Sequence, residues 1–206
     1  RRVLPVVKAL VADGVTVSVD TMRASVAKAV VEAGASIIND VSGGKAEPEI
    51  LDVAADAGVD YVLTHWRGQS ATMQNLVDYN DVVADVISET ARQVDAAMAA
   101  GIDRERIIVD PGIGFSKTAE HNWQLIDAVD TFQDGFTDLR VLWGVSRKRF
   151  LGQLLARNGE DRPARDRDAS TMALSTYFAL HRAWCVRTHE VRANRDAVET
   201  VARVLA

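Results

Sequence analysis

Short apolar runs alternate with helical stretches along this chain, and each run ends in polar residues. The runs cover residues 15–21, 36–40, 61–65, 107–110, 141–146 and 184–189. Runs this short and this rich in β-branched residues are typical of buried parallel strands. The alternation predicts right-handed βαβ units whose strand carboxyl ends all face the same way. We therefore expect the polar run-ends to line one mouth, which is the active-site position of a (β/α)8 barrel.

Helical periodicity fills the stretches between these runs. The expected helices cover residues 22–34, 47–58, 81–100, 119–129, 146–157 and 169–183. Two stretches lack this periodicity: residues 68–80 are expected to form a polar surface loop, and the strongly charged residues 158–168 a mobile loop. The helix over 169–183 is apolar over more of its circumference than one barrel contact requires, so both burial and a subunit interface are open interpretations.

The number of strand–helix units bears on domain organisation. Six units follow an amphipathic helix that ends at Gly14 and has no strand before it. A (β/α)8 barrel needs eight units and typically about 250 residues. We therefore expect residues 1–206 to be one TIM-barrel domain of the α/β class that holds strands 3–8. The first two strands and their loops are expected to lie outside the sequence.

Composition narrows the class of protein. The chain has 206 residues, of which 48% are hydrophobic and 26% charged, as in an ordinary globular domain. A net charge of −5 without any basic run argues against a broad nucleic-acid surface. No apolar stretch approaches the ~18 residues of a membrane span, and no signal peptide is visible, so a cytoplasmic protein is expected. The single Cys185 allows neither a disulfide framework nor a zinc site.

Three of the first four runs end in side chains that recognise hydrogen-bond donors, namely Asp20, Asn39 and Asp110. Asp20 could equally be a helix N-cap, and Asn39 part of a tight turn that Gly43 and Gly44 allow. Asp110 ends a wholly apolar run, where a carboxylate is costly unless it is bonded to donors. Two parallel N–H groups of a planar heterocycle would satisfy it, and an arginine is the competing partner.

Basic residues stand at or just after the ends of the last two runs. Arg147 and Lys148 stand where a strand gives way to a predicted helix, and cations there oppose the positive end of the helix dipole. One interpretation is a solvated helix start, and the other is a bound anion or acceptor-rich ligand. Arg187 and His189, two positions apart, suit an oxyanion such as phosphate. Together the acidic and basic run-ends predict a ligand with a donor-rich flat ring and an anionic leaving group.

Six motifs occur in the order and spacing of one enzyme family. They are Ser18-Val-Asp-Thr21, Asn39-Asp-Val-Ser-Gly-Gly44, His65-Trp-Arg-Gly68, Asp110-Pro-Gly-Ile-Gly-Phe-Ser-Lys117, Gly144-Val-Ser-Arg-Lys-Arg-Phe150 and Val186-Arg-Thr-His189. The chain resembles dihydropteroate synthase along its whole length, and the actinobacterial members most. The resemblance implies a transferase of folate biosynthesis, and a sulfonamide target. Such an enzyme condenses 6-hydroxymethyl-7,8-dihydropterin pyrophosphate with p-aminobenzoate and releases pyrophosphate.

The resemblance also implies roles for individual side chains. Four residues would bind the pterin: Asp20, Asn39, Asp110 and Lys148. Two of these, Asp20 and Lys148, would take part in catalysis, with the charge of Asp20 favouring a cationic methylene-pterin. Two would hold the pyrophosphate: Arg187 and His189. Four would shape the p-aminobenzoate site: Phe115, Lys117, Ser146 and Arg147.

Mg²⁺ as a cofactor and a homodimer are further implications, with the apolar helix 169–183 as the candidate contact between subunits. In the family, an Asn on the first strand ligates the metal, and the first two strand-end loops close over p-aminobenzoate. Neither region falls within this sequence. No metal ligand is therefore expected in this chain, and the polypeptide as written is expected to be inactive or unstable.

Two other functions stay open. A pterin-binding domain of the methyltetrahydrofolate–corrinoid methyltransferase type would share the barrel and the Asp and Asn pocket. It has no pyrophosphate to hold, so Lys148, Arg187 and His189 argue against it. A non-catalytic pterin-binding paralogue is disfavoured by the six intact motifs. The absence of the metal-ligating Asn from the sequence keeps that function open.

Overall fold

The structure, a computed structural model, describes residues 2–68 and 77–206. Most of the surface loop expected over residues 68–80 therefore lies outside the described residues. The chain divides into two compact units. The first comprises residues 1–66 and 88–110, and the second comprises residues 67–87 and 111–206. A single domain over residues 1–206 stays a prediction.

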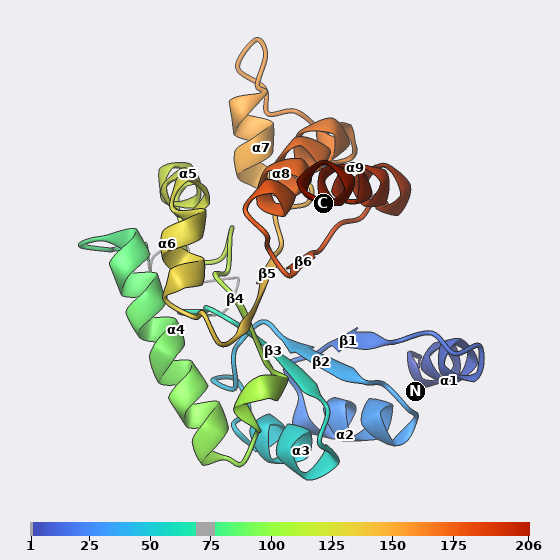
Figure 1. The fold of residues 1–206 in the computed structure, drawn as a ribbon. Coiled ribbons are helices and arrows are strands. Elements are labelled where there is room, and N and C mark those ends of the chain that lie inside the picture. The colour runs from blue at the N-terminus through green and yellow to red at the C-terminus, as the bar shows by residue number, and fades with distance from the viewer. Residues whose placement is uncertain (1, 69–76) are drawn as a thin grey trace. The chain divides into compact units, whose positions relative to one another are not determined.

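The first unit contains a parallel sheet (Figure 1). Its strands are β1 (Ser18–Asp20), β2 (Ile37–Asp40), β3 (Asp60–Thr64) and β4 (Ile107–Asp110). They pair in chain order, each parallel to the next. The predicted strands and their common direction are confirmed here. β4 coincides with its predicted run, whereas β1 occupies only the end of its run.

Helices alternate with the strands of the first unit, as predicted. They are α1 (Leu4–Ala12), α2 (Ala24–Glu32), α3 (Glu49–Ala57) and, from residue 88 onward, α4 (Val82–Ala99), with a 3-10 turn η2 (Arg104–Arg106) before β4. In Figure 1, α2 and α3 lie side by side along the strands. The core is made by strand residues that are fully buried, among them Ile38, Leu63, Ile107 and Ile108.

Asp40, at the end of β2, organises the turn that follows this strand. Its Oδ1 accepts hydrogen bonds from the backbone nitrogen and hydroxyl of Ser42 at 2.8 and 2.7 Å. Its Oδ2 accepts from the Gly44 nitrogen at 2.8 Å and from the Tyr61 hydroxyl at 2.6 Å. Burial, together with the charge of Asp40, raises the pKa of Tyr61 well above its ordinary value, so the phenol remains a donor. The buried carboxylate is thereby satisfied without water.

In the second unit, β5 (Arg140–Trp143) pairs in parallel with β6 (Cys185–Val186). The helices are α5 (Ala119–Asp127), α6 (Val129–Asp134), α7 (Arg149–Leu154), α8 (Asp168–Leu180) and α9 (Val191–Leu205), with a 3-10 turn η3 (Ala164–Arg167). α8 and α9 lie side by side (Figure 1). The core is aromatic: Trp143 stacks on Phe178 with ring centroids 4.7 Å apart and meets Phe132 edge-on at 5.6 Å.

Three expectations for the second unit need correction. The helix expected over 146–157 is confined to α7, because Arg147 has a left-handed φ of 59° that a helix cannot continue through. Residues 158–168 are not an irregular loop throughout, since they contain the turn η3. The last strand has two residues, so Arg187 and His189 follow β6 instead of lying in it.

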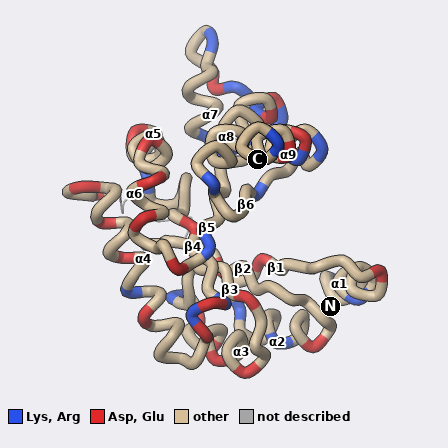
Figure 2. The backbone as a smooth tube through the Cα atoms, in the orientation of Figure 1, with Lys and Arg blue, Asp and Glu red and all other residues tan. Residues whose placement is uncertain are grey.

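Charged residues are distributed over both units. Figure 2 shows Lys and Arg positions interspersed with Asp and Glu positions along the helices. Across residues 2–68 and 77–206, no helix combines the length and the apolar character needed to cross a membrane.

Candidate active site

Acidic and amide side chains share one face of the β1–β4 sheet at its carboxyl end. The register pairs Asp20 with Asn39 and Thr64 with Asp110. Asn39 is also in register with Val62, two residues before Thr64. Residues in register point to the same side of a sheet, and side chains alternate along a strand, so Asp20, Asn39 and Asp110 lie on one face. The structure thus brings these three predicted residues together within the first unit.

These three side chains differ in burial. Asp20 is exposed, whereas Asn39 and Asp110 keep 8% and 7% of their surface accessible. The amide nitrogen of Asn39 donates to Oδ2 of Asp20 over 2.9 Å. That bond fixes the orientation of the amide and leaves its oxygen as an acceptor for another group. The face therefore offers carboxylate and amide oxygens, which recognise N–H donors.

Two side chains of α4 brace this end of the sheet, and sequence reasoning missed both. Nε2 of the fully buried His65, directly after β3, lies 2.9 Å from Glu89. One helical turn further, the amide nitrogen of Gln93 lies 3.4 Å from the carbonyl oxygens of Ser42 and Thr64. These contacts hold the turn after β2 and the end of β3 in place. Their spacing of four residues on one helix is the signal that could have found them.

The loop after β4 is built around a buried lysine. The Gly114 nitrogen donates to Oδ1 of Asn122 at 2.6 Å. Nζ of Lys117 donates to the carbonyl oxygens of Gly112 and Phe115, each at 3.1 Å, and Lys117 is only 4% exposed. Lys117, predicted at the p-aminobenzoate site, thus stabilises the loop that presents Phe115.

Lys148 crosses the same loop. Its Nζ donates to the carbonyl oxygen of Ile113 and lies 4.7 Å from the ring centroid of Phe115, a cation–π distance. Gly114 makes room for it, because a Cβ there would lie 2.9 Å from Cδ of Lys148. Gly114 also has a φ of 81°, which an L-residue seldom adopts. The structure therefore brings the predicted residues Phe115 and Lys148 together.

Ser146 and His189 form a hydrogen-bonded pair after β5 and β6. Oγ of Ser146 accepts from the backbone nitrogen of His189 at 3.1 Å and lies 2.9 Å from its Nδ1. With Nδ1 engaged by this hydroxyl, Nε2 is the ring nitrogen of His189 that can face another group. The backbone nitrogen of Arg187 donates to the Trp143 carbonyl at 3.0 Å and fixes the intervening chain.

Arg147 forms an ion pair with Asp168, which was not predicted from the sequence. Its Nε and Nη2 donate to Oδ1 and Oδ2 of Asp168 at 2.7 and 2.8 Å. Hydrogen bonding to Arg147 lowers the pKa of Asp168, and the same bonds raise the pKa of Arg147. Asp168 ends the charged stretch that was expected to be mobile, and nothing in the sequence pattern marks this pairing.

A cavity of about 460 Å³ lies beside Lys148. Three predicted residues line it: Phe115, Lys117 and Lys148. Arg149 and Phe150 add a further cation and a further aromatic ring. This lining can enclose a flat apolar ring and hold an acidic substituent on it.

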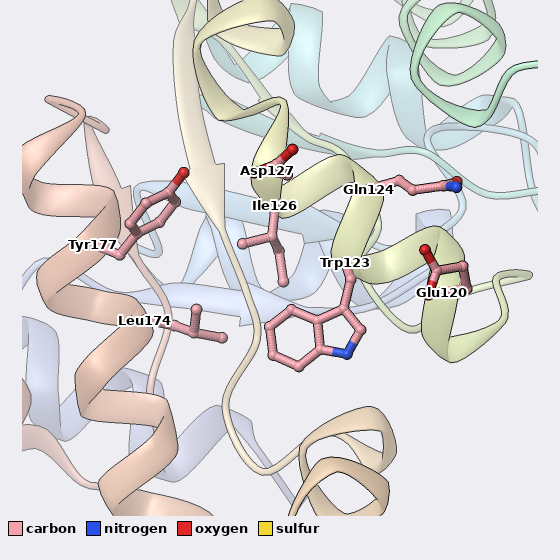
Figure 3. Close-up of a pocket in the computed structure, with 7 residues that line it drawn as sticks. All are labelled: Glu120, Trp123, Gln124, Ile126, Asp127, Leu174 and Tyr177. Carbon is pink, nitrogen blue, oxygen red and sulfur yellow. The ribbon is translucent and has the colours of Figure 1, made fainter.

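A second cavity, of about 420 Å³, lies between α5 and α8. Figure 3 shows Leu174 of α8 pointing toward Trp123 and Ile126 of α5. Among the residues that the structure describes, none of those predicted for the site lines this cavity.

The side chains that could ligate a metal ion decide whether the site can hold one. Among residues 2–68 and 77–206, no group of three or more His, Cys, Asp or Glu side chains could hold a metal ion. Asp20 and Asn39 supply oxygen atoms of the kind that Mg²⁺ prefers, and an ion held by so few side chains would take its other ligands from water and substrate phosphate. The described residues therefore form no closed protein cage for a magnesium ion.

Relatives place the chain among known enzymes. It is 48% identical over 202 residues to dihydropteroate synthase of Mycobacterium leprae (strain TN), an alignment that covers 97% of this chain and 70% of that protein. It is 39% identical over 209 residues to a folate synthesis bifunctional protein of Arabidopsis thaliana, covering 95% of this chain and 42% of that protein. The chain therefore spans part of the length of these relatives.

Solved structures have the same fold. Dihydropteroate synthase from Xanthomonas albilineans in complex with 7,8-dihydropteroate is similar with a TM-score of 0.89 and 37% identity, covering 100% of this chain and 73% of that one. The Yersinia pestis enzyme in complex with a sulfonamide drug is similar with a TM-score of 0.91 and 34% identity, covering 99% of this chain and 72% of that one.

Residues 1–189 match the family described as pterin binding enzyme. With the TIM-type barrel fold of the structural neighbours, this match makes the chain a member of the pterin-binding enzymes. Within that family the chain belongs to the dihydropteroate synthases, transferases of folate synthesis.

Proposed function

We propose that this protein condenses 6-hydroxymethyl-7,8-dihydropterin pyrophosphate with p-aminobenzoate and releases pyrophosphate. The observation that carries the proposal is the shared face of Asp20, Asn39 and Asp110 at the carboxyl ends of parallel strands. Polar groups in that position form the active sites of barrel enzymes. The relative named dihydropteroate synthase at 48% identity supports the reaction.

The pterin ring is assigned to the sheet face that carries Asp20, Asn39 and Asp110. Asp110 would accept hydrogen bonds from the 2-amino group and N3–H, and its burial strengthens such bonds. Asn39 would meet another ring edge through its amide oxygen, since its nitrogen donates to Asp20. In the second unit, the ammonium of Lys148 would donate to the acceptors N5 and O4 of the ring.

The reaction that these groups support is dissociative. The bond between the methylene carbon and the pyrophosphate oxygen breaks, and its electron pair leaves with pyrophosphate. Asp20, near N8, would stabilise the cationic methylene-pterin. Arg187 would neutralise charge on the leaving group, and Nε2 of His189 would donate a hydrogen bond to it. The amine nitrogen of p-aminobenzoate then attacks the methylene carbon and loses a proton. Positioning and charge stabilisation suffice, and no covalent bond to the enzyme forms.

The cavity beside Lys148 is proposed to hold p-aminobenzoate. Phe115 and Phe150 supply apolar walls for its ring, and Arg149 a cation for its carboxylate. Lys117 would shape this site by holding the loop that carries Phe115. Ser146 and Arg147 would shape it through the turn before α7. Sulfonamides, which carry the same aniline ring, would compete for it.

Magnesium is proposed to accompany the pyrophosphate and to add positive charge there. The described residues form no closed cage for this ion. The protein's own part is the neutralisation by Arg187 and the hydrogen bond from His189.

The assembly is proposed to be a homodimer with subunits that meet through α8. Met172 and Leu180 on this helix keep 36% and 50% of their surface exposed, so α8 retains apolar surface that a second subunit could cover. The six strands β1–β6 are proposed to be strands 3–8 of one barrel domain over residues 1–206. A cytoplasmic location stays a prediction, which cell fractionation would test.

Pyrophosphate release from the dihydropterin substrate, measured with and without p-aminobenzoate, tests the reaction. Release that depends on p-aminobenzoate and yields dihydropteroate is expected. A non-catalytic paralogue would bind the pterin without release, and a methyltransferase-type domain would bind a folate instead. Either result would contradict the proposal.

Asp110→Asn tests the pterin site. It replaces two acceptor oxygens with one acceptor and one donor, so pterin affinity measured by calorimetry should fall roughly 10²-fold or more. Asp60→Asn is the matched control, because Asp60 starts β3 at the opposite end of the same sheet and lies 3.8 Å from Arg106. Equal affinities for the two variants would refute the assignment of Asp110.

A further inference from the structure

The turn that joins β5 to α7 holds one residue in an unfavourable conformation. Arg147 has a φ of 59°, and such left-handed conformations raise the energy of non-glycine residues. They persist where surrounding contacts determine them. The contacts around Arg147 are therefore informative about what the turn is for.

The side chain of Arg147 is held by a two-point ion pair. Its guanidinium donates two hydrogen bonds to the carboxylate of Asp168, the first residue of α8, at 2.7 and 2.8 Å. Both side chains are 29% exposed, so the pair is partly shielded from solvent. The parallel geometry fixes direction as well as distance.

The backbone of Arg147 is held from the same side. Its nitrogen lies 3.2 Å from the hydroxyl of Thr171, one turn along α8, and that hydroxyl donates to the Arg167 carbonyl at 3.1 Å. Nη1 of Arg167 donates to the Arg147 carbonyl at 2.8 Å, and its Nε donates to the Arg162 carbonyl at 2.7 Å. Side chain, nitrogen and carbonyl of one residue are thus all anchored to the segment at the start of α8.

The residues before and after Arg147 in the chain, Ser146 and Lys148, belong to the proposed active site. Ser146 contacts Nδ1 of His189, and Lys148 reaches the Ile113 carbonyl and the ring of Phe115. A change in φ at Arg147 would rotate the backbone on both sides of it at once. The contacts that hold Arg147 therefore affect both the Ser146–His189 contact and the Lys148–Phe115 contact.

We propose that Asp168 is a positioning residue, which acts through Arg147 to fix the turn that aims both Ser146 and Lys148. This inference rests on the proposed function, because it assigns Lys148 and His189 to the pterin and the pyrophosphate. Asp168 itself is assigned to neither substrate. The charged stretch 158–168 is then part of the support of the active site.

Asp168→Asn tests the proposal, since it keeps the volume of the side chain and removes one acceptor oxygen and the charge. Small misplacements of catalytic groups can slow turnover by about 10²-fold, so we expect kcat to fall roughly tenfold or more. The KM for p-aminobenzoate should change much less. Asp168→Glu, which keeps the carboxylate, should recover part of kcat. Glu199→Gln is the control, because it breaks the exposed Arg195–Glu199 pair on α9 and should leave kcat unchanged.

A readout without substrate separates this proposal from the proposed function. Ring-nitrogen NMR shifts of His189 report which nitrogen carries the proton. They should move in Asp168→Asn and stay in place in Glu199→Gln, whether or not the protein releases pyrophosphate. Unchanged His189 shifts in a folded Asp168→Asn variant would overturn the proposal. A kcat loss that only follows the unfolded fraction at the assay temperature, and that Asp168→Glu does not relieve, would overturn it as well.

Discussion

The hydroxyl oxygen of Ser146 lies 2.9 Å from Nδ1 of His189 and also accepts the backbone N–H of that histidine at 3.1 Å. One side chain thus fixes both the ring and the main chain of His189. With Nδ1 occupied, Nε2 is the nitrogen that can donate to an anion. This pairing connects Ser146, expected at the p-aminobenzoate site, to His189, which is proposed to hold the pyrophosphate.

Ser146→Ala should therefore weaken pyrophosphate binding by about tenfold, because it removes a hydrogen bond that orients a charged or polar donor. Calorimetry with pyrophosphate measures the affinity. Ser175→Ala is the control, since it removes a buried hydroxyl of the same unit that bonds to Asn194 at 2.7 Å. If both variants bind pyrophosphate equally, the Ser146–His189 pair has no role in anion recognition.

Lys148→Ala should lower kcat with the fold intact, because the side chain is half-buried and its ammonium is proposed to serve the pterin. Circular dichroism and steady-state kinetics report the two effects. Lys28→Ala, which removes an exposed lysine from α2, should have no effect on either. Normal turnover in Lys148→Ala would show that its proposed role is wrong.

Arg187→Ala should reduce turnover by weakening neutralisation of the leaving group. The loss should show mainly as slower pyrophosphate release. Arg192→Ala provides a matched control, because Arg192 is an exposed arginine near the start of α9. Equal rates in these two variants would remove Arg187 from the reaction.

Gly114→Ala should both destabilise the protein and slow catalysis. The new Cβ would lie 2.9 Å from Cδ of Lys148, and the left-handed backbone disfavours alanine by about 1 kcal/mol. Gly159→Ala separates the two effects, because Gly159 has the same φ of 81° and no atom within 4 Å of an added Cβ. Thermal unfolding should report a loss in both variants, whereas kcat should fall only in Gly114→Ala. A fall of kcat in both would show that displacement of Lys148 is not the cause.

Tyr61→Phe should destabilise the first unit by about 1–3 kcal/mol, because it removes a donor from the buried carboxylate of Asp40. The pKa of Tyr61 is raised in the folded state by burial and by Asp40. The stability that this tyrosine adds is therefore fully present below its ordinary pKa of about 10 and declines as the pH rises above it. Urea unfolding between pH 7 and 11 should show that decline in the parent protein and a smaller one in Tyr61→Phe. Identical pH profiles would contradict this account.

Much of the first unit follows from local pattern. The run at 107–110 coincides with β4 residue for residue. Three β-branched residues and Asp110 favour a strand, and Pro111 ends it. The common face of Asp20, Asn39 and Asp110 follows from parallel direction and the two-residue period of a strand. The function of Asp40 could not be read in the same way, since it depends on Tyr61 from the neighbouring strand.

The second unit was less predictable. The helix expected over 146–157 does not include its first residues. Arg147 is held in a non-helical conformation and bonds to Asp168, which is distant in sequence. The site residue Ser146 was predicted, but its partner His189 was assigned separately to pyrophosphate. Bracing by Glu89 and Gln93 was not predicted, because polar residues on a helix are usually solvated.

By itself the sequence determined the alternation of strands and helices, the parallel direction of β1–β4, and the chemical kind of group at each strand end. Those features depend on periodicity and on neighbours within a few residues. Only the tertiary structure decided which of these groups orient one another, as Ser146 does for His189 and Asp168 for Arg147. Each such pair joins two segments that are far apart in sequence. The distance between them in space is set by the packing of the whole unit, and no local sequence pattern predicts it.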